Sequence, residues 1–329
     1  MSNPPVFNAT RRLVLAGTIA AAAPAWAQAP AFQPKRPVRV VVPFPAGGAT
    51  DLTARLIAAK LMDMWGQPVA VDNRPGASGM IGAQEVLRAP ADGHTIMVSI
   101  TTHIQNPSLF AKMPYEPMRD FAAVSQSVLS YLALAVRPDF PANTLAEFVA
   151  HVKAKPGAYT FGSFGAASSS HIVGESFGRQ IGAEVIHVAY KGSAPMLADL
   201  LGGQVPLGWA DVSTAIPHIR AGKLKALAVS GSKRTPMLPD VPTLGESGYP
   251  GYEPLGWAGV FVHGATPKPM VEAIARDVIR ATRHPDNLAK FAEQTLVPVA
   301  STPDEFTRQL REDAETWAKM IKAAGISPQ

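Results

Sequence analysis

Residues 38–56 read VRVVVPFPAGGATDLTARL: a short apolar strand, a turn containing Gly47 and Gly48, and the start of a helix. Residues 158–177, AYTFGSFGAASSSHIVGESF, have the same order. In such a corner the first amides of the helix lack intrahelical partners and lie at the positive end of the helix dipole. Two of these corners, roughly a domain's length apart, predict two lobes that hold one anionic ligand between them.

Valine-rich apolar segments alternate with segments of helical spacing along the rest of the chain. We expect strands at residues 38–42, 69–72, 95–100, 121–127, 132–136, 159–163, 184–188, 205–209, 224–229 and 256–262. We expect helices at residues 51–64, 79–88, 144–153, 169–180, 194–201 and 215–221, and a mostly helical tail from 269 to 324. This alternation predicts an α/β fold with mixed, mostly parallel sheets, which bind ligands beyond the carboxyl ends of their strands.

The lobes are expected to be joined by crossing strands, because the sequence contains no repeat and no long polar linker. Residues 132–136 and 256–262 are the best candidates for these strands. They predict a first lobe made of residues 28–138 and 254–329, and a second lobe inserted between them at 139–253.

The N-terminus is typical of a cleaved export signal. Arg11 and Arg12 precede an apolar run that is shorter than the roughly 20 residues of a bilayer-spanning helix, and Ala25-Trp26-Ala27 provides small residues for cleavage. The paired arginines are similar to a twin-arginine signal. We therefore expect cleavage near Ala27, at the end of segment 1–27, and a periplasmic protein.

Composition excludes several function classes. The full chain carries +5 at pH 7, and +3 without the export signal, which holds two arginines and no acidic residue. Basic segments interleaved with aromatics are absent from the sequence, so nucleic acid is not an expected partner. Since the sequence has no cysteine, it can form neither disulfides nor zinc–thiolate sites. No nucleotide-binding or metalloprotease motif occurs, and we expect no cofactor and no metal.

Seven motifs resemble the solute receptors of tripartite tricarboxylate transporters, the Bug family. They cover nearly all of the expected mature chain and read PFPAGGATD, NRPGASGMIG, DGHTIMVS, NPSLF, VAYKGSAPMLADLLGGQV, PHIRAGKLKALAVSGSKRTPMLPDVPTLGESGYPGYE and WAGVFVHGATPKP. The resemblance implies a two-lobed periplasmic binding protein of the type II clamshell. It further implies a non-enzymatic receptor that closes on a small carboxylate and presents it to a permease of two integral membrane subunits. We expect the receptor to be a monomer and the carboxylate to be a dicarboxylate.

The resemblance places one ligand carboxylate against the first corner. The residues of this corner that we expect to contribute are Phe44, Ala46, Gly47, Gly48 and Asp51. Glycine lets the backbone approach a ligand without a Cβ clash. Because Asp51 would repel a carboxylate, we expect it to be a helix cap or to hold a water.

The second corner differs from the family pattern, in which an Asn-Gly-Thr/Ser run commonly precedes Ser-Ser-His. Here Ala166-Ala167-Ser168 replaces that run, so a side-chain amide is lost and the turn is restricted. The expected binding residues of this corner are Ser163, Gly165, Ala166, Ser168, Ser169 and His171. For His171, a buried histidine bonded to backbone is an equally good interpretation.

Two other strand ends contribute expected site residues. Thr101, Thr102 and His103 follow the strand at 95–100 and are expected in a loop that faces the cleft. Asp211 fits the family pattern after the strand at 205–209, and it could bind a ligand amine or hydroxyl, or a water.

Two alternatives remain open on the sequence. A receptor of the same fold could report its ligand to a sensor kinase or another partner instead of a permease. An exported hydrolase is the third hypothesis, because Gly174-Glu175-Ser176-Phe177-Gly178 matches the G-x-S-x-G elbow. That elbow needs a strand before the serine, whereas Ser176 is expected inside a helix.

Overall fold

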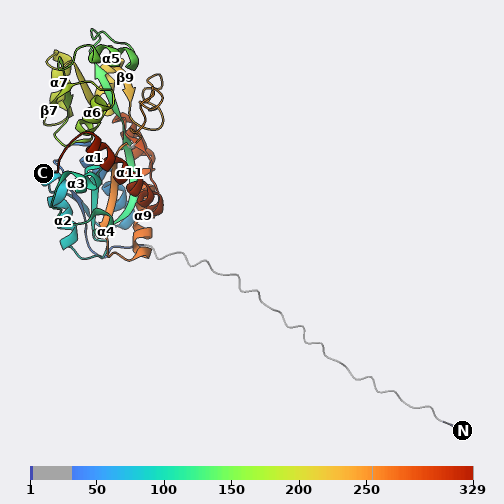
Figure 1. Ribbon diagram of the computed structural model, residues 1–329. Coiled ribbons are helices and arrows are strands. Elements are labelled where there is room, and N and C mark those ends of the chain that lie inside the picture. Colours follow the sequence, from blue (N-terminus) through green and yellow to red (C-terminus); the bar gives the residue numbers. More distant parts are fainter. Residues whose placement is uncertain (3–31, 254, 329) are drawn as a thin grey trace.

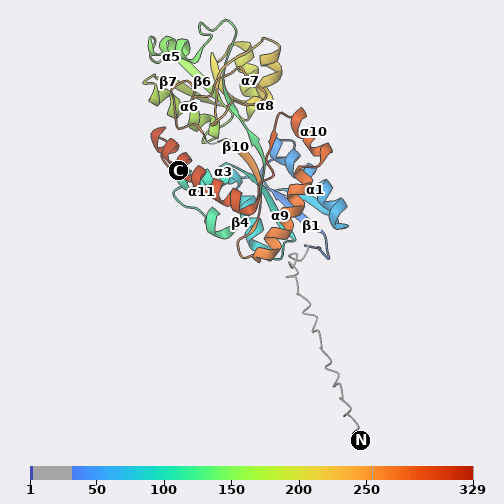
Figure 2. The same ribbon diagram turned by 90° about the vertical axis from the view of Figure 1, so that its right-hand side faces the viewer.

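The computed structural model describes residues 1–2, 32–253 and 255–328. The chain folds into two α/β lobes stacked end to end. Figure 1 shows one lobe above the other, and Figure 2 shows the strands that pass between them. We call the lobe built on the first sheet the first lobe, and the lobe built on the second sheet the second lobe.

The first lobe contains a six-stranded sheet in the order β11-β4-β10-β3-β1-β2. Its strands are β1 (Val38–Val42), β2 (Val69–Asn73), β3 (Thr95–Ile100), β4 (Phe121–Ser130), β10 (Gly256–His263) and β11 (Val297–Pro298). The sheet is mixed: β1 pairs in parallel with β2 and β3, while β10 pairs antiparallel with β3 and β4.

Helices cover both faces of this sheet. They are α1 (Ala49–Trp65), the 3₁₀ turn η1 (Ala77–Gly79), α2 (Met80–Arg88), α3 (Thr102–Leu109), α4 (Pro117–Asp120), α9 (Lys268–Thr282), α10 (Pro285–Glu293) and α11 (Pro303–Ala323). Because both faces are covered, four of the five residues of β1 are valine: Val40 and Val42 belong to one buried cluster and Val41 to another. The exception is Arg39, whose partly exposed side chain forms ion pairs with Asp72 and Glu85.

The second lobe contains a five-stranded sheet in the order β7-β6-β8-β5-β9. Its strands are β5 (Leu132–Val136), β6 (Tyr159–Ser163), β7 (Val185–Ala189), β8 (Leu207–Asp211) and β9 (Lys225–Val229). Its helices are α5 (Leu145–Lys153), α6 (Ser169–Gln180), α7 (Ser193–Gly202) and α8 (Val212–Arg220). Strand β6 is parallel to β7 and β8, whereas β5 is antiparallel to β8 and β9.

The connection between the lobes is short. A single residue, Tyr131, separates β4 of the first sheet from β5 of the second, and β10 returns to the middle of the first sheet. One apolar cluster extends from Phe261 and Trp317 in the first lobe to Phe177 and Trp209 in the second. The lobes therefore share packing as well as strands. The proposed boundaries at 138/139 and 253/254 stay a prediction.

One predicted loop is a helix. The segment after β3 was expected to present Thr101, Thr102 and His103 from a loop, but α3 begins at Thr102 and includes Pro107. His103 is 3% exposed and packs against the rings of Tyr115, Phe121 and Phe261. Burial lowers the pKa of His103 to about 3, so this residue belongs to the core and not to the cleft.

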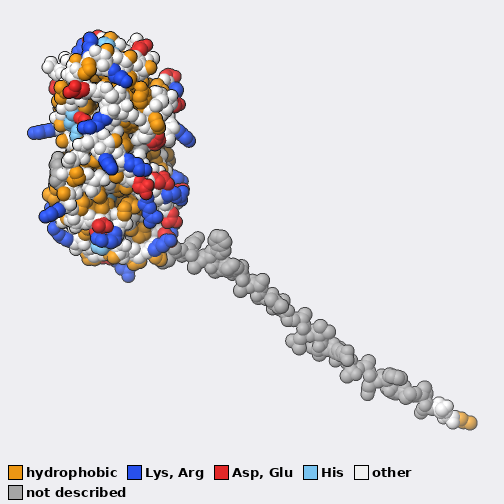
Figure 3. Space-filling model, viewed as in Figure 1, with side chains coloured by type: hydrophobic (Ala, Val, Ile, Leu, Met, Phe, Trp, Pro, Cys, Tyr) orange, Lys and Arg blue, Asp and Glu red, His pale blue; other side chains and the backbone are white. Residues whose placement is uncertain are grey.

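Residues 3–27 of the expected export signal lie outside the described part of the chain. Within the described part, no helix combines the length and the apolar character needed to cross a membrane. On the face that Figure 3 shows, Lys and Arg side chains lie interspersed with Asp and Glu.

Candidate functional site

A cavity of about 220 Å³ lies between the two lobes. Its walls come from both sheets and from the strands that join the lobes. The lining residues are Ala49, Thr50, Thr53, Ile100, Thr101, Thr102, Val128, Ser130, Leu132, Phe164, Ser168, Ser169, Asp211, Ser213, Gly256, Trp257, Ala258 and Leu296.

Four helices begin at this cavity. The lining includes the first residues of α1 (Ala49, Thr50), the boundary of α3 (Thr101, Thr102), the boundary of α6 (Ser168, Ser169) and the boundary of α8 (Asp211, Ser213). Each helix N-terminus has amides without intrahelical partners and a partial charge of roughly +0.5. Among the described residues, no Lys or Arg side chain lines the cavity. The partial positive charges at the cavity wall therefore come from backbone amides.

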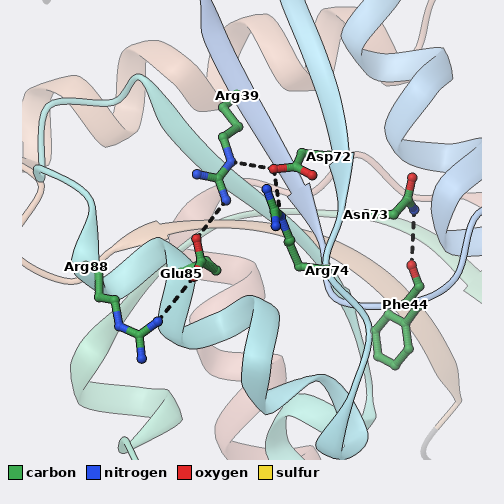
Figure 4. Close-up of polar contacts among 7 residues, drawn as sticks. All are labelled: Arg39, Phe44, Asp72, Asn73, Arg74, Glu85 and Arg88. Atoms are coloured by element: carbon green, nitrogen blue, oxygen red, sulfur yellow. Dashed lines mark hydrogen bonds and ion pairs between the residues drawn. The ribbon is translucent and has the colours of Figure 1, made fainter.

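The first corner is held by a hydrogen-bond network around Asp51. This carboxylate accepts from Gly47 N at 3.0 Å, Arg55 Nε at 2.9 Å and Asn73 Nδ2 at 3.0 Å. Burial raises the pKa of Asp51, but the three donors outweigh that effect and lower it. Asn73 also donates to Phe44 O at 3.1 Å, a contact drawn in Figure 4 beside the ion pairs that join β1, β2 and α2.

These bonds determine what the first corner offers a ligand. The amide of Gly47 is used within the corner, whereas α1 begins after Gly48 with no side-chain cap. The amides of Ala49 and Thr50 are therefore the helix N-terminal amides that this corner presents at the cavity wall.

The second corner is held by side chains of its own. Ser168 caps α6 by accepting from His171 N, and its hydroxyl donates to Gly165 O at 2.6 Å. Ala167 adopts a left-handed backbone with φ 57°, and its amide donates to His171 Nδ1 at 3.0 Å. His171 thus supports a turn that an alanine does not favour.

Behind this corner, His171 stacks on His187 with ring centroids 3.8 Å apart and planes 11° apart. His187 Nε2 lies 2.6 Å from Ser163 Oγ, and burial followed by the His171 charge lowers the pKa of His187 to about 4. Glu175 brings a carboxylate close enough that one ligand atom from each of the three residues lies within 4.8 Å of the others. Since the lone pairs of stacked imidazoles lie in parallel planes, these two rings do not converge on one ion in this arrangement.

Asp211 ends β8 and forms the boundary of α8. Its carboxylate accepts a hydrogen bond from Ser193 Oγ at 3.1 Å. Burial raises the pKa of Asp211 to about 6, and the Ser193 bond offsets part of that rise. Asp211 is the charged side chain of the cavity lining.

The connecting strands supply the remaining wall. Trp257 on β10 lines the cavity, donates its amide to Thr101 Oγ1 at 3.0 Å and donates its indole N–H to Asp313 Oδ2 at 3.1 Å. The hydroxyl oxygen of Thr101 therefore accepts from the strand, while its O–H can still donate. Trp257, Phe164 and Leu296 give the cavity an apolar side that suits the carbon chain of a ligand.

A hydrogen bond joins the lobes at the cavity. Gln105 of α3 donates from Nε2 to Ser169 Oγ of α6 at 3.1 Å. Gln105 is fully buried, and its Oε1 has no partner among the described residues.

Five of the residues expected from the sequence line the cavity together: Thr101, Thr102, Ser168, Ser169 and Asp211. Ala46, Gly47 and Gly48 are exposed in the first corner outside the lining, and Phe44 and Asp51 pack behind it. In the second corner Ser163, Gly165 and His171 support the turn from within, while Ala166 is exposed. Their contact with a ligand stays a prediction.

Sequence reasoning missed the cavity walls between the helices. The first residues of α1, Ala49 and Thr50, line the cavity, whereas the glycines before them had been expected to do so. The strands at 132–136 and 256–262 were predicted as lobe-joining strands and not as cavity walls, and the strand expected at 121–127 ends before Val128 and Ser130. A useful signal existed, because strands that join two lobes must border whatever space lies between them.

The G-x-S-x-G motif at residues 174–178 does not form a nucleophile elbow. Ser176 lies in the interior of α6, and its hydroxyl is 3.3 Å from the hydroxyl of Tyr252. It is not at a strand-to-helix turn, which the nucleophile of that fold requires.

Comparison with known proteins agrees with this architecture. The family model described as "Tripartite tricarboxylate transporter family receptor" matches residues 53–326. BugT of Bordetella pertussis is 34% identical over 322 residues, which cover 97% of this chain and 99% of that protein.

Two solved structures carry bound dicarboxylates. An R. palustris protein solved with adipate is 34% identical, with a TM-score of 0.78 over 90% of this chain and 99% of its own. MatC from Rhodopseudomonas palustris, solved with bound malate, is 33% identical, with a TM-score of 0.74 over 88% of this chain and 99% of its own. Matching motifs, two-lobed fold and full-length relatives together show that this chain belongs to the tripartite tricarboxylate transporter receptor family of solute-binding proteins.

Proposed function

We propose that the protein is an exported, monomeric periplasmic receptor that captures a small dicarboxylate between its lobes and delivers it to the membrane subunits of a tripartite transporter. The observation that carries this proposal is the convergence of four helix N-termini on one cavity with no Lys or Arg in its described lining. A dicarboxylate suits such a site because each lobe can offer amides and hydroxyls to one of its two carboxylates.

The size and strength of the site fit a ligand of this class. The cavity of about 220 Å³ is smaller than the roughly 300–1,000 Å³ of pockets for drug-sized molecules. Hydrogen bonds to a charged group contribute about 1.5–3 kcal/mol each, and micromolar binding requires about 8 kcal/mol. Two or three such bonds at each carboxylate reach that value after desolvation and closure costs. The relatives solved with adipate and malate support a dicarboxylate.

The test is a calorimetric and thermal-shift screen of mono-, di- and tricarboxylates against the chain from Gln28. A dicarboxylate that binds the native state should raise the melting temperature by mass action and remain chemically unchanged. Ala49→Glu places a negative charge at the cavity wall, where it stabilises α1 through the helix dipole but repels an anionic ligand. We expect unchanged or higher stability and at least tenfold weaker binding.

The matched control is Ala46→Glu, in the same corner but outside the cavity lining. We expect binding within about twofold of the original at physiological salt, because an exposed charge is screened there. An equal loss of ligand affinity in both variants would contradict the assignment of the cavity as the binding site. Conversion of the ligand into another compound would contradict a receptor role.

A further inference from the structure

Asp211 places a carboxylate without a cationic partner in a site that we propose binds carboxylates. The described lining of the cavity contains no other titratable side chain. The hydroxyl of Ser193 is its hydrogen-bond donor, and no described cation forms an ion pair with it. Asp211 is partly buried at the cavity wall, and a ligand that closes over it displaces the water that solvates its charge. A charge without water is normally paired or neutralised, so in the complex the partner of this carboxylate comes with the ligand or with a proton.

The charge balance distinguishes between these options. Four helix N-termini contribute roughly +2 in total, at about +0.5 each. A bound dicarboxylate contributes −2, which these dipoles balance. An ionised Asp211 would add a third negative charge with no cation to oppose it. A neutral Asp211 keeps the balance and also supplies an O–H donor, which makes a short, strong hydrogen bond to a carboxylate oxygen.

Resting on the proposed function, we propose that Asp211 binds the ligand as a neutral carboxylic acid: capture of a dicarboxylate dianion takes up one proton from solution, and Asp211 donates a hydrogen bond to a ligand oxygen. No bond other than this O–H is formed or broken. The receptor thereby carries its ligand together with a proton.

The surroundings of Asp211 favour this behaviour. Strands β5 and β6 and helices α6, α7 and α8 pack around β8. The titratable or charged residues on these five elements are Tyr159, His171, Glu175, Arg179, Asp199, His218 and Arg220. None of them acts on the pKa of Asp211, which responds to burial and to the Ser193 bond alone. A dianion brought next to this group raises its pKa further.

The sign and size of the effect follow from linkage. With a pKa of about 6 before binding, Asp211 is mostly ionised at pH 7, so complete protonation in the complex takes up about 0.9 proton. Affinity should fall roughly five- to tenfold between pH 7 and pH 8, and level off below about pH 6, where the free receptor is already protonated.

The experiment is titration calorimetry of the intact receptor with succinate, adipate, malate and aspartate at pH 7 in phosphate, imidazole and Tris. The dependence of the observed heat on buffer ionisation enthalpy gives the number of protons taken up. Wild type should take up close to one proton with the dicarboxylate that binds. Asp211→Asn should bind that dicarboxylate about as well at pH 7 with no uptake and a flat pH profile, because its amide also donates.

Two further variants sharpen the result. Ser193→Ala removes the donor that lowers the pKa of Asp211, so uptake at pH 7 should decrease because the free receptor is already partly protonated. Asp139→Asn removes an exposed carboxylate paired with Arg137 on the surface, and uptake should stay at the wild-type value.

Zero uptake by wild type at pH 7 overturns the proposal, and so does loss of dicarboxylate binding in Asp211→Asn. If only aspartate binds and Asp211→Asn abolishes it, Asp211 accepts from a ligand ammonium instead. Failure of every acid to bind at pH 6 and pH 7 is a different result, since it removes the proposed function itself.

Discussion

At the scale of single residues, the second corner combines an unfavourable backbone with a side chain that supports it. Ala167 has φ 57°, a region in which a Cβ costs roughly 1–2 kcal/mol. The family pattern commonly has glycine in this run, where the same conformation is free of strain. The bond from the Ala167 amide to His171 helps to hold the turn in place.

We expect Ala167→Gly to stabilise the protein by about 0.5–1 kcal/mol, because the relief of strain exceeds the entropy that glycine adds to the unfolded chain. Urea unfolding followed by circular dichroism measures the difference. Ala166→Gly is the matched control: its backbone is not left-handed, so only the entropic cost remains and stability should fall. A gain in both variants would contradict this account.

The histidine stack makes a prediction about pH. The folded-state pKa of His187 is about 4, below its ordinary value of 6.5, so the unfolded state binds more protons between these values and stability is lost as pH falls through them. Because the ring is only half-buried, we expect the loss to be on the order of 1 kcal/mol. His187→Gln should unfold with less difference between pH 7 and pH 5 than wild type does. Identical pH profiles would show that the stack carries no such linkage.

At the scale of elements, α11 is held at its start by a reciprocal capping box. Thr302 Oγ1 accepts from Glu305 N at 3.3 Å, and Glu305 Oε2 accepts from Thr302 N at 2.8 Å. This helix packs against α6 of the other lobe, so the position at which α11 begins affects the packing of both lobes.

Thr302→Ala should cost about 1 kcal/mol of unfolding free energy, since it leaves the Glu305 amide without its cap. Thr316→Ala, within the same helix, removes a hydroxyl bonded to the Glu312 carbonyl and should change stability by less than about 0.5 kcal/mol. Chemical denaturation of both variants measures the contrast, and a cost at Thr316 equal to that at Thr302 would argue against the cap.

Element-level patterns were predictable where periodicity was strong. Val38–Val42, Thr95–Ile100 and Ser169–Gln180 have the expected bounds. Helix α3 was missed because its β-branched start and Pro107 disfavour a helix locally, whereas tertiary packing of His103 and Ile104 stabilises it. The cavity walls were not predictable in the same way, since Val128, Trp257 and Ala258 read as ordinary core residues until the two sheets are placed together.

At the scale of the whole molecule, the bond between Gln105 and Ser169 exists only while the lobes touch. A ligand that favours contact between the lobes shifts the population toward this arrangement. We therefore expect the bond to contribute to ligand affinity even though Gln105 is not part of the cavity lining.

We expect Gln105→Ala and Ser169→Ala each to weaken ligand binding about two- to tenfold, the range of one net hydrogen bond. The double variant should lose less than the sum of the two, because each change removes the same bond. Titration calorimetry measures the cycle. Gln180→Ala, which removes a bond to Pro250 within the second lobe, should leave affinity unchanged. Full additivity would show that the two residues act separately.

The central position of β10 has a consequence for how the protein folds. This strand lies between β3 and β4 in the first sheet, although the entire second sheet separates it from β4 along the chain. During synthesis the first sheet cannot be completed until β10 has been made. The second lobe is one continuous segment of the chain and can fold as soon as that segment has left the ribosome. Closing so long a loop is slow. We therefore expect the inserted lobe to form first, leaving the first lobe incomplete until the C-terminal third of the chain has been made.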